Sequence, residues 1–228
     1  QPATINQHPA PWYLLAFFFI VSFVYFFFFG SYVLFFQEQQ SLFQYRGSYF
    51  DDFLSKPGAV LDLFGKFLTQ FYISKLAGSI ILAAVLTLPG IILLQINRRL
   101  MPVSGLSNLL ILIPSCLLLI MQTHYYHFMM YNLGFLIAVL FFLIVVTTET
   151  KNLKYFTLAF FPIFFYIAGA FSLIFIGLFI LYCLIYIKGP GKYYYPLTLL
   201  ALVLISVLIF SRIFLLQSVK QLFLYPLP

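Results

Sequence analysis

Charged residues are scarce in this chain, and their scarcity excludes most soluble folds. Only 7% of the 228 residues are Asp, Glu, Lys or Arg, whereas 64% are hydrophobic. A soluble domain carries about a quarter charged residues, so this inventory cannot build a water-facing surface. The mean hydropathy of +1.06 agrees with that conclusion. The apolar runs are long and continuous rather than alternating, which favours membrane-spanning helices over barrel strands.

Cysteines and recognisable catalytic motifs are also lacking. The two cysteines, Cys116 and Cys183, lie inside apolar segments and indicate small core residues rather than a disulfide framework or a metal motif. The sequence has no phosphate loop, nucleophile elbow, dinucleotide fingerprint or haem motif. The net charge is +7, but no basic run is longer than Arg98-Arg99. The basic residues therefore indicate topology signals and contacts with membrane lipids, and no nucleic-acid partner is expected.

The long apolar segments predict an all-α, polytopic membrane protein with about seven transmembrane helices and a large first external loop. About 20 apolar residues suffice to cross the hydrocarbon core. Segment 156–187 is much longer, so we predict two short spans broken near Ala168-Gly169-Ala170, with one long tilted helix as the alternative. The predicted seven-helix membrane domain is 12–216, with spans at about 12–36, 69–96, 106–121, 128–148, 156–168, 170–187 and 195–216 and a surface loop at 37–68.

The two ends of the chain are predicted to lie outside this membrane domain. Residues 1–11 are polar and proline-rich, which is typical of a flexible lead-in, and residues 217–228 form a tail. The abrupt ending at Pro226-Leu227-Pro228 indicates that the tail leads to a missing C-terminal part.

The distribution of charges along the connections predicts a cytoplasmic N-terminus. The connections on that side are short, nearly free of acids and basic, as cytoplasmic loops tend to be. Their basic residues are Arg98, Arg99, Lys151, Lys154, Lys188 and Lys192. The long first loop and its acids then lie on the outer side of the membrane.

Four of the five acidic residues fall in segment 37–70. They are Glu38, Asp51, Asp52 and Asp62, and the simplest interpretation is that they are solvated charges at headgroup level that pair locally with Arg and Lys. The functional interpretation is a carboxylate at the membrane boundary, where partial desolvation makes it a better general base. Glu38, Asp51 and Asp52 are the candidate catalytic residues. Asp51 and Asp52 together are also candidate ligands of a divalent metal ion, since hard cations take several oxygen ligands.

A second group of residues is suited to binding a lipid phosphate. His124 and His127 are spaced to share one helical face, on the same predicted side as the acidic loop. An interface cap or a phosphate contact explains such a pair better than a metal site, because the neighbouring sequence offers no third ligand. Arg46, Lys75 and Arg212 are the other candidates on that side, and for Lys75 and Arg212 snorkelling to the interface is the default explanation.

The surface loop also carries a resemblance to a known family. Residues 37–42 (QEQQSL) and 55–72 (SKPGAVLDLFGKFLTQFY) resemble an uncharacterised family of bacterial multi-pass proteins that is typical of Bacteroidetes. Members share an "EQ…LF" element after the first span and a "PGG…Y…FLxQF" element before the second. Here Ala59 replaces the second Gly, and Phe64 stands near the usual Tyr. The resemblance implies a bacterial inner-membrane location, a chain that is longer in other members, and no assigned activity.

The predicted architecture is more distantly similar to the seven-span module of the GT-C glycosyltransferases. That resemblance implies polyprenyl-phosphate sugars as substrates and a catalytic carboxylate in the first external loop, at Glu38 or at Asp51-Asp52. The acidic pair that usually follows the first span directly is absent, because Gln39 follows Glu38. Likeness of fold alone does not assign an activity.

Three functions therefore compete at this point. The first is a transferase that acts on lipid-linked substrates at the outer face of the inner membrane. The second is a non-enzymatic anchor or assembly subunit whose partners are other membrane proteins, which the low density of polar residues inside the spans favours. The third, a transporter, has the least support, since we find no ionisable residue near the middle of a predicted span.

Overall fold

The computed structural model describes residues 12–41, 43–54, 56–100, 110–148 and 150–213. Within these ranges the regular structure is entirely helical, with no strand, so the all-α class is confirmed. The predicted lead-in at 1–11 and the predicted tail at 217–228 lie outside the described residues. The helices are α1 (Trp12–Val24), η1 (Tyr25–Phe29), α2 (Ser31–Gln40), α3 (Gly47–Leu54), α4 (Ala59–Thr69), η2 (Gln70–Ile73), α5 (Lys75–Leu100), α7 (Leu112–Gln122), α8 (Met129–Thr147), α9 (Lys151–Ala159), α10 (Phe161–Ala168), η3 (Gly169–Phe171), α11 (Ser172–Tyr186) and α12 (Gly191–Ile213).

Five helical runs in the described part are long and apolar enough to cross a membrane, fewer than the seven predicted. They are Trp12–Phe29, Lys75–Leu100, Met129–Thr147, Phe161–Tyr186 and Gly191–Arg212. The predicted third span, at about 106–121, begins outside the described residues. Its described part contains α7, whose 11 residues reach about 16 Å at 1.5 Å per residue. The predicted fifth and sixth spans fall largely within one run, Phe161–Tyr186, which counts as a single candidate.

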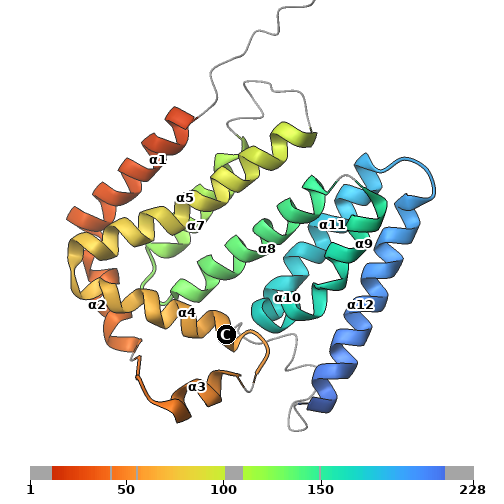
Figure 1. Cartoon of the computed structure of the whole chain (residues 1–228). Coiled ribbons are helices and arrows are strands. Elements are labelled where there is room, and N and C mark those ends of the chain that lie inside the picture. The colour runs from red at the N-terminus through yellow and green to blue at the C-terminus, as the bar shows by residue number, and fades with distance from the viewer. Residues whose placement is uncertain (1–11, 42, 55, 101–109, 149, 214–228) are drawn as a thin grey trace, which may run out of the picture.

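The chain reverses its direction inside that run. Lys154 Nζ of α9 lies 3.3 Å from the hydroxyl of Tyr182 in α11, whereas a continuous helix would separate these residues by about 42 Å. The rings of Phe161 and Phe175 are also close, with 6.0 Å between centroids. The 3₁₀ turn η3 begins at Gly169, whose φ of 55° favours glycine. Figure 1 shows α9 and α10 running one way and α11 returning beside them.

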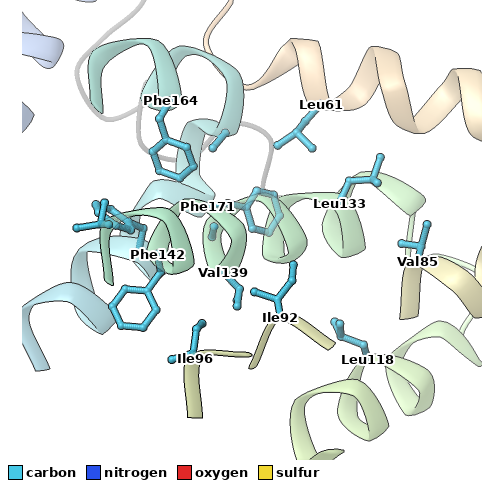
Figure 2. Packing of buried hydrophobic residues seen from close by; sticks show 14 of the residues in the cluster. Leu61, Val85, Ile92, Ile96, Leu118, Leu133, Val139, Phe142, Phe164 and Phe171 are labelled. Carbon is cyan, nitrogen blue, oxygen red and sulfur yellow. The ribbon is translucent and has the colours of Figure 1, made fainter. Parts of the chain in front are cut away.

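Helices α5 and α8 form the centre of the bundle. α5 packs against α1 on one side and α8 on the other, and α8 also contacts α4 and α11. Figure 2 shows the core between them, where Ile92 and Ile96 of α5 face α8 while Phe164 and Phe171 approach α8 from the opposite side. Burying these side chains excludes lipid and joins the helices through close van der Waals packing.

The bundle has two chemically different ends. At the basic end, Arg98 lies over the ring of Trp12, and α9 and α12 begin. The other end, which we call the acidic end after its carboxylates, Glu38, Asp51 and Asp62, contains α3, α4 and the start of α8 (Figure 1). Tyr166 at the end of α10 holds this end together, because its hydroxyl donates to Leu54 O at 2.7 Å and its carbonyl accepts from Gly58 N at 2.7 Å.

Helix α4 is packed into the protein more deeply than a helix that only rests on a membrane surface. Its buried face includes Leu61 and Gly65, while Phe64 is 57% exposed. A Cβ at Gly65 would stand 3.1 Å from the backbone nitrogen of Met130, so the absence of a side chain lets α4 approach the start of α8.

Candidate functional site

A polar cavity opens between the end of α2, helix α4 and the start of α8. Its volume is about 250 Å³. It contains an ion pair between Asp62 and Lys66, one helical turn apart, with 3.3 Å between Oδ2 and Nζ. Both side chains are partly exposed, so they remain accessible from the cavity. The lining residues are Gln40, Ser41, Asp62, Gly65, Lys66, Thr69, Phe128, Met129 and Met130.

A larger groove, which we call the histidine groove, lies on the other side of Phe128. Its volume is about 650 Å³ and its walls are mainly apolar. Two of the residues predicted to bind a lipid phosphate, His124 and His127, line this groove. The lining residues are Leu118, Met121, His124, Tyr126, His127, Phe128, Tyr131, Phe135, Phe171 and Ile174. Phe128 lines both the polar cavity and the histidine groove, so the two spaces are adjacent.

A chain of hydrogen bonds fixes His127 at the edge of the groove. Gln37 Nε2 donates to the carbonyl oxygen of His127 at 2.6 Å. His127 Nε2 lies 3.1 Å from Asn132 Oδ1, and Asn132 Nδ2 donates to Gln122 Oε1 at 2.6 Å. Gln37, Gln122 and Asn132 are fully buried, so each bond forms where no water competes for its donor or acceptor.

The chain of bonds is consistent with one tautomer of His127. Because Asn132 donates to Gln122 through Nδ2, its Oδ1 faces His127 as an acceptor. With the Asn132 amide in this orientation, Nε2 of a neutral His127 carries the hydrogen and Nδ1 keeps its lone pair. Burial lowers the pKa of His127 below its ordinary value of 6.5, the hydrogen bond to Asn132 opposes that shift, and the charge of His124 adds to it. The lowered pKa favours the neutral form of His127, which can accept a proton.

The predicted carboxylates occupy different places at the acidic end. Glu38 is half-buried in the last turn of α2, close in sequence to Gln40 and Ser41 of the polar cavity. Asp51 is exposed on α3, and Asp52 belongs to the same helix. Asp62, which the sequence groups with these acids without a catalytic assignment, is the carboxylate in the lining of the polar cavity. Its charge also raises the pKa of Tyr49, after the larger effect of burial.

The remaining predicted phosphate ligands are spread over the acidic end. Arg46 is exposed just before α3, and Arg212 is exposed near the end of α12. Lys75 begins α5, with Nζ 5.0 Å from the centroid of the Phe27 ring, where a cation–π interaction holds it. Of the five predicted residues, the two histidines are the ones that line the histidine groove.

The described residues offer no cluster of three or more His, Cys, Asp or Glu side chains that could hold a metal ion. Asp51 and Asp52 are consecutive residues of α3. The divalent-metal hypothesis for these two residues stays a prediction.

Sequence reasoning missed the buried amides of this site. Gln37 lies 90 residues before His127, whereas Gln122 and Asn132 are 10 residues apart. The fold joins Gln37 and Asn132 to His127 by hydrogen bonds and links Gln122 through Asn132. The available signal was their position, because Asn132 stands within an apolar span and both glutamines stand at helix ends. A polar side chain at such a depth needs an internal partner.

Comparison with known proteins places the chain in a family. No curated protein and no solved structure matches it. Residues 8–228, nearly the whole chain, match a family described as a family of unknown function, DUF6057. The resemblance to an uncharacterised family is thus confirmed as far as the family's unknown function, whereas its bacterial origin and the likeness to GT-C enzymes stay predictions. The chain belongs to the DUF6057 family.

Proposed function

We propose that this protein is a membrane transferase that acts on a lipid-linked phosphate substrate, bound in the histidine groove at the acidic end of the bundle. The observation that carries the proposal is the juxtaposition of a 650 Å³ apolar groove bearing two histidines with a polar cavity bearing a carboxylate. An amphiphilic substrate needs these two environments side by side, since its lipid chain and its head group differ in polarity.

The lipid chain fits the apolar walls of the groove. Met121 and Ile174 come from α7 and α11, and both are accessible at the groove surface. The exposed His124 provides the phosphate contact at the membrane boundary, while neutral His127 accepts a proton or a hydrogen bond. Phosphate oxygens accept hydrogen bonds, and a ring N–H of His124 is a suitable donor.

Asp62 is the proposed general base, because it lines the cavity next to the groove. The carboxylate takes the proton of an acceptor hydroxyl, and the hydroxyl oxygen attacks the carbon that is bonded to the phosphate oxygen. The carbon–oxygen bond to the phosphate breaks, and the lipid phosphate leaves with the bonding electrons. General base catalysis of this kind contributes about 10²–10⁴-fold to a rate.

The proposed orientation places the acidic end on the outer face of the inner membrane of a bacterium, with the N-terminus in the cytoplasm. In this proposal the chain crosses seven times: α7 belongs to one crossing, and η3 divides the run Phe161–Tyr186 into two. Basic side chains at the opposite end agree with the excess of Lys and Arg in cytoplasmic loops. Cysteines introduced at Tyr45 and Tyr193, which are 80% and 72% exposed, test this orientation in intact cells.

In that test a membrane-impermeant maleimide labels Tyr45→Cys and leaves Tyr193→Cys unlabelled until the cells are opened. The native cysteines are first replaced, with Cys116→Ser and Cys183→Ala. The reverse pattern would invert the orientation, and equal labelling of both positions would exclude an odd number of crossings between them.

Lipid binding by the purified full chain tests the proposed function itself. We expect a long-chain polyprenyl phosphate to bind more tightly than the corresponding polyprenol, which lacks the phosphate. Ile174→Trp fills the groove and should weaken binding of the phosphate at least about tenfold, equivalent to 1.4 kcal/mol. The matched control is Ile20→Trp in the apolar groove between α1 and α5. Equal affinity for both lipids, or equal effects of both variants, would remove the proposal.

A second candidate function, a non-enzymatic anchor or assembly subunit, is favoured by the outermost helices. The runs Trp12–Phe29 and Gly191–Arg212 are each only 22% buried, so a broad apolar surface is left for lipid or for another subunit. Extraction in a mild detergent distinguishes the two functions. A partner present in fixed ratio, together with an empty histidine groove in the lipid-binding assay, would favour the subunit.

A further inference from the structure

We propose that the apolar groove between α1 and α5, which we call the α1–α5 groove, binds an anionic phospholipid. One acyl chain of the lipid lies along the groove, and the phosphate contacts Arg98 at the basic end of the bundle. The α1–α5 groove shares no lining residue with the polar cavity or the histidine groove. The inference therefore goes beyond the proposed function and does not depend on it.

One face of each helix lines the α1–α5 groove. Its volume is about 630 Å³. On both helices the lining residues recur at spacings of three and four, so each helix contributes a single stripe of side chains. Ala16 on α1 and Ala84 on α5 are the smallest residues of these stripes and leave room between the larger ones. The lining residues are Trp12, Leu15, Ala16, Phe19, Ile20, Ala84, Thr87, Leu88 and Ile91.

Close packing beside the groove fixes the two helices relative to each other. A Cβ at Gly90 would stand 2.8 Å from Cδ2 of Leu15, so α1 and α5 touch where Gly90 has no side chain. The one hydroxyl in the lining, that of Thr87, donates to the carbonyl oxygen of Ala83 at 2.7 Å. Its hydrogen is thus used inside α5, and the walls offer apolar contacts that suit a hydrocarbon chain.

A cation stands at one end of this apolar surface. The guanidinium carbon of Arg98 lies 5.4 Å from the centroid of the Trp12 ring, and Trp12 belongs to the lining. Arg98 is exposed in the last turn of α5, and within the described residues no carboxylate pairs with it. A guanidinium group binds phosphate oxygens through two parallel hydrogen bonds, and tryptophan rings favour headgroup depth. The end of the groove at Trp12 is therefore suited to a lipid phosphate.

The length of the groove favours a lipid over a helix of another subunit. From Trp12 to Ile20 the lining on α1 extends about 12 Å at 1.5 Å per residue. One leaflet provides about half of the ~30 Å hydrocarbon core, so the groove fits within a single leaflet. A partner helix that crosses the membrane needs a surface along the whole core. A phospholipid chain needs one leaflet, and basic side chains near the headgroups attract anionic lipids.

The tryptophan in the groove provides the test. Trp12 is the only tryptophan of the chain, so quenching of its fluorescence by phospholipids with brominated acyl chains reports a chain in contact with this site. The full chain is reconstituted in phosphatidylcholine bilayers, into which brominated phosphatidylglycerol or brominated phosphatidylcholine is titrated. We expect phosphatidylglycerol to bind about fivefold more tightly, which corresponds to one basic side chain near the phosphate. Equal binding of the two lipids would overturn the inference.

A pair of charge variants separates Arg98 from the general positive charge of the chain. Arg98→Gln should remove most of the preference for phosphatidylglycerol. Lys188→Gln is the matched control, because it removes one exposed basic side chain from the connection between α11 and α12. That variant should keep the preference. Equal losses in the two variants would assign the preference to surface charge and overturn the site at Arg98.

A second pair tests the place of the acyl chain. Ala16→Phe fills the groove and should weaken quenching by brominated phosphatidylglycerol severalfold. Ala201→Phe, at an exposed alanine of α12, should leave the quenching as in the wild type. Undiminished quenching in Ala16→Phe would place the chain outside the groove and refute the inference. None of these variants alters the histidine groove, so their failure leaves the proposed function standing.

Discussion

The ring of Phe171 lies directly against the backbone of Gly134. A Cβ at Gly134 would stand only 2.2 Å from Cδ2 of Phe171, a separation that two carbon atoms do not tolerate. Phe171 closes the turn at the end of η3 and lines the histidine groove, while Gly134 lies in the second turn of α8. The glycine therefore determines how closely the turn approaches α8, in the manner of small residues at helix contacts in membranes.

Gly134→Ala should destabilise the protein although alanine favours helices. The added methyl forces Phe171 out of its place, and overpacking of this kind costs about 1–3 kcal/mol, against a gain in helix propensity of about 1 kcal/mol. We expect a lower melting temperature in detergent. Adding Phe171→Leu should recover part of the loss, and a double variant no more stable than Gly134→Ala would show that the ring is not the obstacle.

Asn132→Leu tests the buried chain of hydrogen bonds. It leaves Gln122 Oε1 and His127 Nε2 without their partner, and we expect a loss of about 1–2 kcal/mol, within the range for hydrogen bonds between helices in membranes. Chemical denaturation in mixed micelles measures the change. Thr87→Val is the control, because the hydroxyl of Thr87 bonds the carbonyl of Ala83 in its own helix. Equal losses in the two variants would contradict a special role for the chain of bonds.

Stability should fall on acidification because of His127. Its pKa in the folded protein lies below the ordinary 6.5, so the unfolded chain binds more protons between the two values. The stabilisation is complete above pH 6.5 and is lost as the pH falls from 6.5 towards the lower folded value. Melting curves from about pH 8 to pH 5 should show this decline, which His127→Gln reduces. The exposed His124→Gln should retain most of it, and an unchanged decline in His127→Gln would refute the assignment.

Single substitutions of the carboxylates distinguish the sequence-based candidates from the one that lines the cavity. Asp62→Asn should lower transfer from a lipid-linked donor by at least about 10²-fold, the lower bound for a general base. Glu38→Gln, Asp51→Asn and Asp52→Asn should retain most activity. A large loss in Glu38→Gln with an active Asp62→Asn would instead support the sequence-based prediction and exclude Asp62 as the base.

The sequence was sufficient for the helical class because long apolar segments leave a backbone no other way to satisfy its hydrogen bonds in lipid. It also located the break at Gly169, where glycine interrupts a segment that is too long for one crossing. It was less informative on α4, because the sequence alone does not reveal that Gly65 lets the helix approach the start of α8.

The composition of the site was harder to predict, since it depends on contacts over long distances in the chain. Gln37 and His127 are 90 residues apart, and Asn132 reaches Gln122 across the connection between α7 and α8. Local patterns identified the two histidines because their spacing is visible within a few residues. They could not indicate that Asp62, and not Glu38, would line a cavity next to those histidines.

The two hydrogen bonds of Tyr166 connect the walls of the polar cavity and the histidine groove. They clasp the segment before α4 to the end of α10, at Leu54 and Gly58, and the turn that holds Phe171 follows α10 directly. Helix α4 forms one wall of the polar cavity, and Phe171 belongs to the wall of the histidine groove. These two walls are therefore connected through Tyr166.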